Sequence, residues 1–193
     1  MNKFKKILIL ILLMFPALLL TAQQYKVKWT SYSYRVSIIN DTIKKVINTS
    51  TWCDGAESKN ILKAGDDGWV AYKVNQTNTH RAIGLQSGAY GFCWGTIGHG
   101  LYLRIDGKLI KVIGAQETIL TTYAAGDSIK VGRIGTKIFY YKNNIKLDST
   151  SVNNNLDLYV DAMIWSYQGA FENIVASFDV LKVTSSTPGS RKG

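Results

Sequence analysis

The chain has 193 residues, with 23 basic and 13 acidic side chains and a formal net charge of +10. The basic residues are spread along the sequence without a block of like charge. This pattern favours solubility and weak attraction to anionic surfaces, and argues against nucleic acid as a partner. Beyond the amino-terminal segment, roughly 170 residues remain, which is the size of one domain with its own core.

Residues 1–22 predict a signal peptide. Three lysines precede an apolar run at 7–20, and the small residue Ala22 follows. This order of basic, apolar and small residues predicts secretory cleavage near Ala22. The run is interrupted by Pro16 and is shorter than the roughly 20 residues that span a bilayer, so we expect no stable transmembrane anchor. Cleavage would remove three positive charges and no acid, leaving +7. The mature protein is expected to be secreted, periplasmic or at the cell surface.

Short β-branched and aromatic runs recur between Gly, Asn and Asp clusters, and helical periodicity is nearly absent. This spacing predicts a single antiparallel β-sandwich of the jelly-roll type over residues 25–183. The small, polar and basic residues 185–193 are predicted to form a disordered tail. The predicted strands lie at 34–39, 42–47, 68–74, 81–86, 101–106, 108–113, 128–134, 137–143, 145–149, 157–166 and 174–183.

Turn residues predict hairpins between several of these strands. Asp106-Gly107 lies between two alternating runs, and a type I′ turn there would need a positive φ at both positions. Gly135 and Asn143-Asn144 repeat the signal within residues 123–147. That stretch is therefore predicted to be two successive hairpins with a structural role.

Several aromatic residues lie within the strand patterns. Trp29, Trp69 and Trp165 have alternating neighbours and are predicted to be in the core. Tyr32 and Tyr34 alternate with serines, which fits either a core edge or an exposed aromatic strip.

The chain has two cysteines, Cys53 and Cys93. An exported protein enters an oxidising compartment, where the two can form a disulfide, and the alternative is two separate thiols. The sequence leaves both open. No nucleophile signature surrounds either cysteine, so a Cys–His catalytic pair with His80 or His99 is not expected.

The segments GWVAYKV, RAIGLQSG and AAGDSIKVGRIGTKIFYYKNN, in this order, resemble the concanavalin A-like lectin and glucanase superfamily, particularly the SPRY-like exported modules of bacterial surface proteins. The leader ending TAQQ resembles exported proteins of the Bacteroidota. The resemblance covers nearly all of residues 25–183 and implies the jelly-roll fold, but its matching positions are mostly structural and imply less about function. They are Trp52, Gly55, Ala56, Ser58, Gly84-Leu85, Gly126-Asp127 and Asn143-Asn144.

Jelly-roll glycosidases of the laminarinase type carry two catalytic glutamates in a Glu-x-Asp-x-Glu pattern on one strand face. Here Glu57, Glu117 and Glu172 are far apart in sequence. Asp157 and Asp161 are four residues apart, and we expect them to be solvated or turn-binding. An enzyme is therefore not expected, and a glycan-cleaving activity is the least favoured alternative.

No cofactor or metal is expected. The pair Asp66-Asp67 offers oxygen atoms in a turn but lacks the alternating ligands of a calcium loop. A calcium site assembled from separate loops is left open.

Aromatic residues in Gly-rich segments form the candidate binding site. An aromatic face stacks on a sugar ring while polar groups bond its hydroxyls, although such aromatics also commonly seal one end of a sandwich. A disulfide would bring both Cys segments to one rim. We expect a non-catalytic, lectin-like recognition module for a glycan or cell-surface component, the alternative being an adhesive or structural protein that binds other proteins. The candidate residues are Trp52, Asp54, Asn78, His80, Arg81, Tyr90, Phe92, Trp94 and His99.

Overall fold

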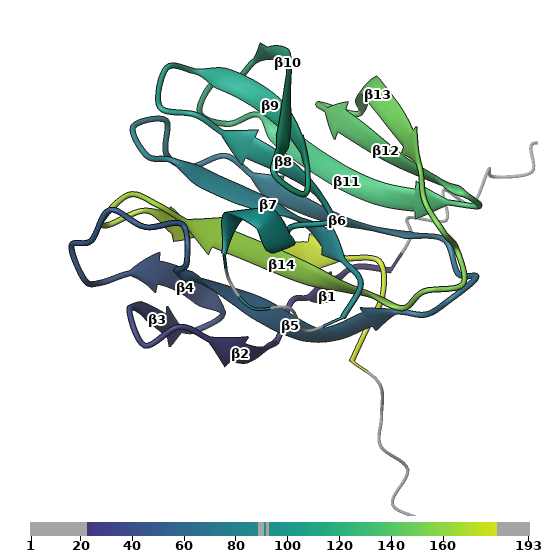
Figure 1. Ribbon diagram of the computed structural model, residues 1–193, viewed down its shortest axis with the longest axis horizontal. Coiled ribbons are helices and arrows are strands. Elements are labelled where there is room, and N and C mark those ends of the chain that lie inside the picture. The colour runs from purple at the N-terminus through teal and green to yellow at the C-terminus, as the bar shows by residue number, and fades with distance from the viewer. Residues whose placement is uncertain (1–22, 89–90, 92, 181–193) are drawn as a thin grey trace, which may run out of the picture.

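The computed structural model describes residues 23–88, 91 and 93–180 (Figure 1). The predicted signal peptide and tail lie outside the described residues, as do the candidate site residues Tyr90 and Phe92. Every strand pairing is antiparallel, and two large sheets pack against each other. The predicted antiparallel β-sandwich is confirmed.

One layer of the sandwich is a seven-stranded sheet. Its strands, in spatial order, are β10 (Gln116–Thr122), β9 (Lys108–Ile113), β8 (His99–Leu103), β7 (Arg81–Gln86), β14 (Leu158–Ile164), β5 (Gly55–Leu62) and β2 (Trp29–Tyr32).

The second layer is a six-stranded sheet, and a small three-stranded sheet lies at one end of the molecule. The six strands, in spatial order, are β1 (Tyr25–Lys26), β16 (Val175–Ala176), β6 (Gly68–Lys73), β11 (Ser128–Ile134), β12 (Lys137–Lys142) and β13 (Ile145–Ser151). The small sheet contains β15 (Ala170–Phe171), β4 (Thr42–Lys45) and β3 (Val36–Ile39).

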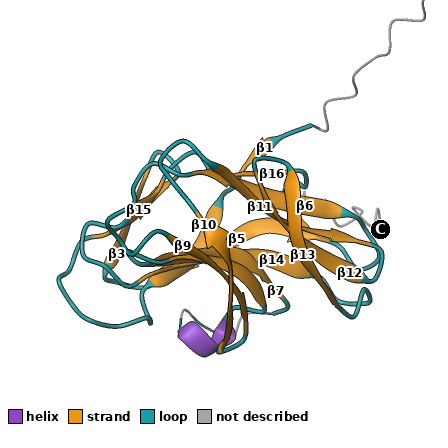
Figure 2. Cartoon of the chain, turned by 90° about the horizontal axis from the view of Figure 1, so that it is seen from above, coloured by secondary structure: helices purple, strands orange, loops and turns teal. Residues whose placement is uncertain are grey.

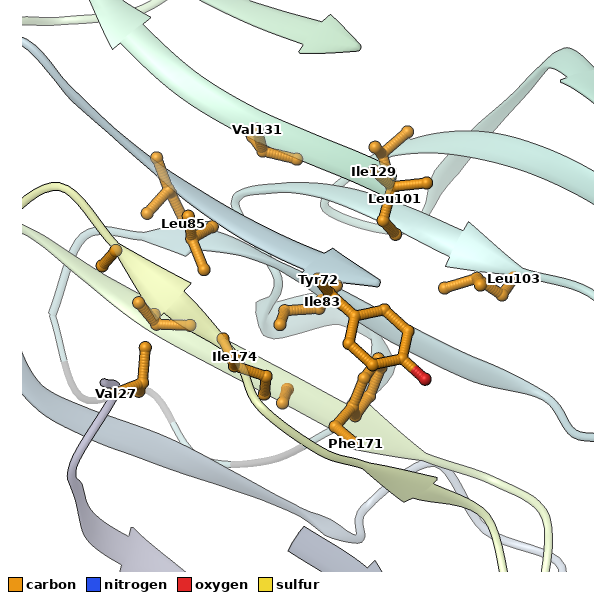
Figure 3. Close-up of a cluster of buried hydrophobic side chains, with 14 of the residues drawn as sticks. Val27, Tyr72, Ile83, Leu85, Leu101, Leu103, Ile129, Val131, Phe171 and Ile174 are labelled. Atoms are coloured by element: carbon orange, nitrogen blue, oxygen red, sulfur yellow. The ribbon is translucent and has the colours of Figure 1, made fainter. Parts of the chain in front are cut away.

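The main core fills the space between the two large sheets. Alternate residues of each strand point inward, so that Leu85 and Leu101 of one sheet face Tyr72 and Val131 of the other (Figure 3). These side chains are almost completely buried. Burial of this apolar surface is the main contribution to the stability of the fold.

A second, smaller apolar cluster lies on the outer face of the seven-stranded sheet. It is covered by the segment that contains the short 3-10 helix η1 (Trp94–Thr96), which lies on the side of β7 and β14 away from β6 and β11 (Figure 2). Gly84 and Gly100 are paired beneath this segment, and Ile97 occupies the space that a side chain at Gly100 would need. The cluster contains Ala82, Ile97, Tyr102, Ile110, Val112 and Met163, with Trp52 and Trp94 packed against it.

The predicted turns were partly right. Asn143 and Asn144 both have positive φ, as a type I′ hairpin between β12 and β13 requires. Asn40 and Asp41 form an equivalent turn between β3 and β4 that the sequence analysis missed. The type I′ prediction for Asp106-Gly107 is wrong: only Gly107 has a positive φ, and its N–H bonds back to Arg104 across a longer loop.

Residues 123–147 form two successive hairpins, as expected, and Asp127 stabilises them. Its carboxylate accepts hydrogen bonds from the backbone N–H of Ala124 (2.9 Å) and the side-chain amide of Asn143 (2.7 Å). The stretch therefore has the structural role that its turn residues indicated.

Two long strands were missed. β5 follows the Trp52-Cys53 segment and contains a bulge, where the Ser58 hydroxyl accepts the hydrogen bond of the Val160 N–H (2.9 Å). β10 carries mostly exposed residues on both faces, so its alternation is weak. Both strands lack the half-buried alternating pattern on which the prediction depended.

Candidate functional site

The structure brings together part of the predicted aromatic rim. The rings of Trp52 and Trp94 have centroids 4.4 Å apart, and Trp52 also contacts Tyr102 and Trp165. We call Trp52, Trp94, Tyr102, Trp165 and His80 the aromatic cluster. It lies beside a disulfide between Cys53 and Cys93, which joins the two segments that carry Trp52 and Trp94.

A buried ion pair holds the segment beneath this cluster. The Lys45 ammonium lies 2.8 Å from the Asp54 carboxylate and donates hydrogen bonds to the backbone carbonyls of Thr49 and Trp165. Arg35 contacts the same carboxylate at 3.2 Å. Burial of Asp54 opposes its ionisation, but the hydrogen bonds from Lys45 and Arg35 prevail and lower its pKa.

Two predicted binding residues are corrected by their burial, and a third, His99, by the direction of its side chain. Asp54 is fully buried in the ion pair, and Arg81 is fully buried with its guanidinium hydrogen-bonded to Tyr72 and to backbone carbonyls. His99 lies on the inner face of β8, where Nδ1 is 3.3 Å from the Tyr140 hydroxyl of the opposite sheet. These side chains stabilise the sandwich and do not line its rim.

The remaining rim residues divide between the cluster and the loops. The Tyr102 hydroxyl lies 2.6 Å from His80 Nδ1. Burial raises the pKa of Tyr102 to about 12 and lowers that of His80, so the hydroxyl donates to a neutral imidazole. Asn78 is exposed in the loop between β6 and β7. Trp52 has three aromatic neighbours and packs on the second apolar cluster, which favours a structural role; a ligand at Trp94 stays a prediction.

A carboxyl pair that was not predicted lies on the outer face of the seven-stranded sheet, the face that also carries the aromatic cluster. Glu57 of β5 and Asp161 of β14 are directly opposite each other, which places their Cβ atoms about 5 Å apart. Asp161 is fully buried and Glu57 is 6% exposed, so neither can contact a substrate in this structure. Burial raises the pKa of both groups, and the neighbouring Glu57 raises that of Asp161 further.

A different candidate site lies on the outer face of the six-stranded sheet. Trp69 of β6, Gly132 of β11 and Phe139 of β12 form one row across three strands, so the glycine leaves a gap between two aromatic residues. A Cβ at Gly132 would approach Trp69 Cβ at 2.7 Å, which makes the glycine a requirement of this packing. The next row contains Lys130 and Tyr141.

Lys130 lies at the centre of this face. Its ammonium nitrogen is 4.8 Å from the centroid of the Tyr141 ring and 5.7 Å from that of the Trp69 ring. It also donates a hydrogen bond to the Asn144 side chain at 3.3 Å. These cation–π contacts hold the lysine between two aromatic residues while leaving ammonium hydrogens free for a ligand.

Two adjacent hollows share Trp69 and Lys130, and together we call them the sheet groove. Their volumes are 450 and 430 Å³, which fall in the range of small-ligand sites. The first is lined further by Asp67, Gly68, Gly132, Arg133, Ile134, Tyr141 and Ser177, and the second by Gln24, Ala71, Tyr72, Lys73, Ser128, Asn144, Asn173 and Val175.

The prediction that Trp69 and Trp165 lie in the core is wrong for both residues. Trp165 follows β14 and joins the aromatic cluster, whereas Trp69 is half-buried on the open face of β6. The alternation of side chains along the strand could have predicted the position of Trp69. Val70 and Tyr72 are the inward residues of GWVAYKV, so Trp69 points to the other face.

The two antiparallel sheets form a jelly-roll sandwich, the fold that the sequence resemblance implied. Two solved SPRY domains are similar to it. The SPRY domain of human HERC1 has a TM-score of 0.53 and 16% identity and covers 79% of this chain and 100% of that chain. A second human SPRY domain has a TM-score of 0.54 and 17% identity, covering 79% and 99%. This likeness establishes the fold and no activity.

No protein-family model matches the sequence, and no curated protein is significantly similar to it. Within residues 23–88, 91 and 93–180, no helix has the length and apolar character needed to cross a bilayer. The same residues contain no group of three or more His, Cys, Asp or Glu side chains placed to hold a metal ion.

Proposed function

We propose that this protein is an exported, non-catalytic recognition module that binds carbohydrate in the sheet groove. The observation that carries the proposal is the arrangement of Trp69, Tyr141 and Lys130 around two open hollows. An aromatic ring stacks on the apolar face of a sugar, and the amides of Asn144 and Asn173 supply hydrogen bonds to hydroxyls. The site therefore differs from the rim predicted from the sequence.

The arrangement of carboxylates supports binding over cleavage. Glycoside hydrolysis by the common mechanisms needs two carboxyl groups about 5 to 9.5 Å apart beside the substrate. Among the described residues that line the groove, Asp67 is the single carboxylate. The pair Glu57 and Asp161 is on the opposite sheet and is buried.

The disulfide and the leader support export. Disulfides persist in oxidising compartments, and the bond between Cys53 and Cys93 joins segments 40 residues apart. A basic, apolar and small-residue leader directs a chain to the same compartments.

A glycan array with the purified protein tests the proposal. We expect saturable binding to a subset of glycans, and Trp69→Ala should reduce that binding by about tenfold or more, because truncating an aromatic anchor of a binding site commonly costs about 2 kcal/mol or more. Trp94→Ala is the matched control from the aromatic cluster and should leave affinity unchanged. Loss of binding in Trp94→Ala alone would return the site to the predicted rim.

A protein partner is the second candidate function, because the small sheet carries an exposed apolar surface. Ile39 is 67% exposed and Val46 is 42% exposed, and both line a hollow of 270 Å³ together with Ser37 and Lys44. Exposed apolar patches of this kind mark protein contacts. If the array is blank, binding of a surface protein that is lost in Ile39→Ser would favour this alternative.

A further inference from the structure

Charge is distributed unevenly over the six-stranded sheet. Seven ion pairs join described side chains, and none of them involves Lys73, Lys130, Lys137 or Lys146. All four residues point to the outer face: Lys73 shares the phase of Trp69, Lys137 that of Phe139, and Lys146 is paired with Tyr141. The face therefore presents four cations that have no carboxylate partner within the described part of the chain.

The opposing negative charge in the groove is small. Asp67 lines the first hollow at its end, and its Oδ1 accepts the backbone N–H of Gly135 (2.7 Å). The second hollow is lined by Lys73 and Lys130 and, among the residues that the structure describes, by no acidic side chain. A bound anion would therefore meet lysines that no carboxylate of residues 23–88, 91 and 93–180 already neutralises.

The lysines are placed along the aromatic surface. The Lys146 ammonium nitrogen lies 5.7 Å from the centroid of the Phe139 ring. Lys146 is two strands away from Lys130, which corresponds to about 10 Å across the sheet. One extended polymer could thus contact aromatic faces and ammonium groups alternately. A neutral glycan would use the rings and amides alone.

From these observations, and resting on the proposed function of the groove, we infer that its ligands are acidic glycans, in which the sugar rings carry carboxylate or sulfate groups. Lys130 contacts the anionic group at the centre of the groove, and Lys73 and Lys146 contact neighbouring anionic groups. An ammonium group is a compact point charge and does not select planar carboxylate over sulfate, so both sources share this chemistry.

Isothermal titration calorimetry with pairs of charged and neutral polymers tests the inference. Polygalacturonate and its fully methyl-esterified form share one backbone, and the esterified form carries an uncharged methyl ester in place of each carboxylate. Dextran sulfate and dextran form the corresponding sulfate pair. We expect binding to at least one acidic polymer to be about tenfold tighter than to its neutral counterpart, the contribution of one charged hydrogen bond. Lys130→Gln should remove most of this preference, and the two pairs separate carboxylate from sulfate.

Control variants separate the possible failures. Lys59→Gln removes an equal charge from an exposed position on β5 of the other sheet and should leave the preference intact. Equal binding to charged and neutral polymers that is lost in Trp69→Ala would overturn the inference and leave the proposed function standing. Binding to neither form of any polymer would count against both. A third outcome is acid-selective binding that falls equally in Lys59→Gln and Lys130→Gln. If this binding also survives Trp69→Ala and disappears at high salt, it reflects diffuse surface charge and overturns the inference.

Discussion

At the scale of single residues, the buried carboxyl group of Asp161 is the least expected feature of the protein. Neither of its side-chain oxygens has a hydrogen-bond partner among the described residues, and Glu57 lies opposite it across the strand pair. Gln86 donates a hydrogen bond to Glu57 at 2.8 Å, which leaves Asp161 without that support. The pair is therefore most stable when protonated.

This protonation predicts a loss of stability at alkaline pH. The pKa of Asp161 is raised in the folded protein, so its contribution is complete below the unfolded value near 4 and is lost as the pH rises through the folded pKa. Asp161→Asn keeps the shape without the charge and should raise Tm at pH 8 by about 2–6 °C, with little change at pH 4. Thermal unfolding of the wild type and of Asp161→Asn from pH 4 to 8 measures this difference in Tm.

Asp157→Asn is the matched control. Asp157 forms an exposed ion pair with Lys63 and its pKa is lowered, so its replacement should not raise stability at pH 8. A fall in Tm at every pH for Asp161→Asn would contradict the prediction, because it would mean that the carboxylate is ionised and partnered.

The ion pair of Lys45 and Asp54 has the opposite pH dependence. Both side chains are fully buried, so Lys45→Met leaves a buried carboxylate whose remaining ionic partner is Arg35, and should cost about 3–5 kcal/mol. Because the pKa of Asp54 is lowered, the stability that the pair contributes is present above the unfolded value near 4 and declines as the pH falls through the folded pKa. The difference in the free energy of unfolding between wild type and Lys45→Met, measured with urea, should therefore become smaller as the pH falls below about 4.

Lys44→Met provides a comparison at the adjacent, exposed position of β4 and should change stability by less than about 0.5 kcal/mol. Equal effects of the two substitutions would show that the buried pair contributes nothing beyond a surface charge.

At the scale of the elements, the disulfide fixes the segment of η1 over the seven-stranded sheet. The bond closes a loop across 40 residues, and the chain-entropy relation predicts a stabilisation of about 4 kcal/mol. Cys53→Ser combined with Cys93→Ser should lower the free energy of unfolding by this order. It should also weaken the near-ultraviolet circular dichroism of the stacked Trp52 and Trp94.

The groove is on the opposite sheet, and glycan affinity should persist in the folded double variant. Denaturant unfolding with and without a reducing agent provides the same comparison on the native sequence. An unchanged transition midpoint after reduction would contradict a stabilising role for the bond.

At the scale of the whole molecule, the sequence predicted the fold well because the alternation of strands and turn residues is a local signal. β5 and β10 were not predicted. β5 is buried on both faces and β10 is largely exposed, so neither strand has alternating apolar and polar residues. The sequence also indicated that Trp52 and Trp94 could meet at a disulfide, since each follows or precedes a cysteine.

The groove could not be predicted in the same way. It depends on which residues of β6, β11 and β12 are opposite one another, and this register is a long-range property that a single sequence does not reveal. The proximity of Glu57 and Asp161 has the same origin, because strands distant in the chain are neighbours in the sheet.

The separation of the tryptophans between the two faces has an optical consequence. Trp52 contacts both Trp94 and Trp165 on the seven-stranded sheet, and Trp29 packs against the main core, while Trp69 lies on the opposite face within the proposed binding groove. A ligand in the groove would therefore alter the emission of Trp69 and leave the light from the clustered indoles as a constant background. The protein thus carries an intrinsic fluorescent reporter that distinguishes occupancy of one face from changes on the other.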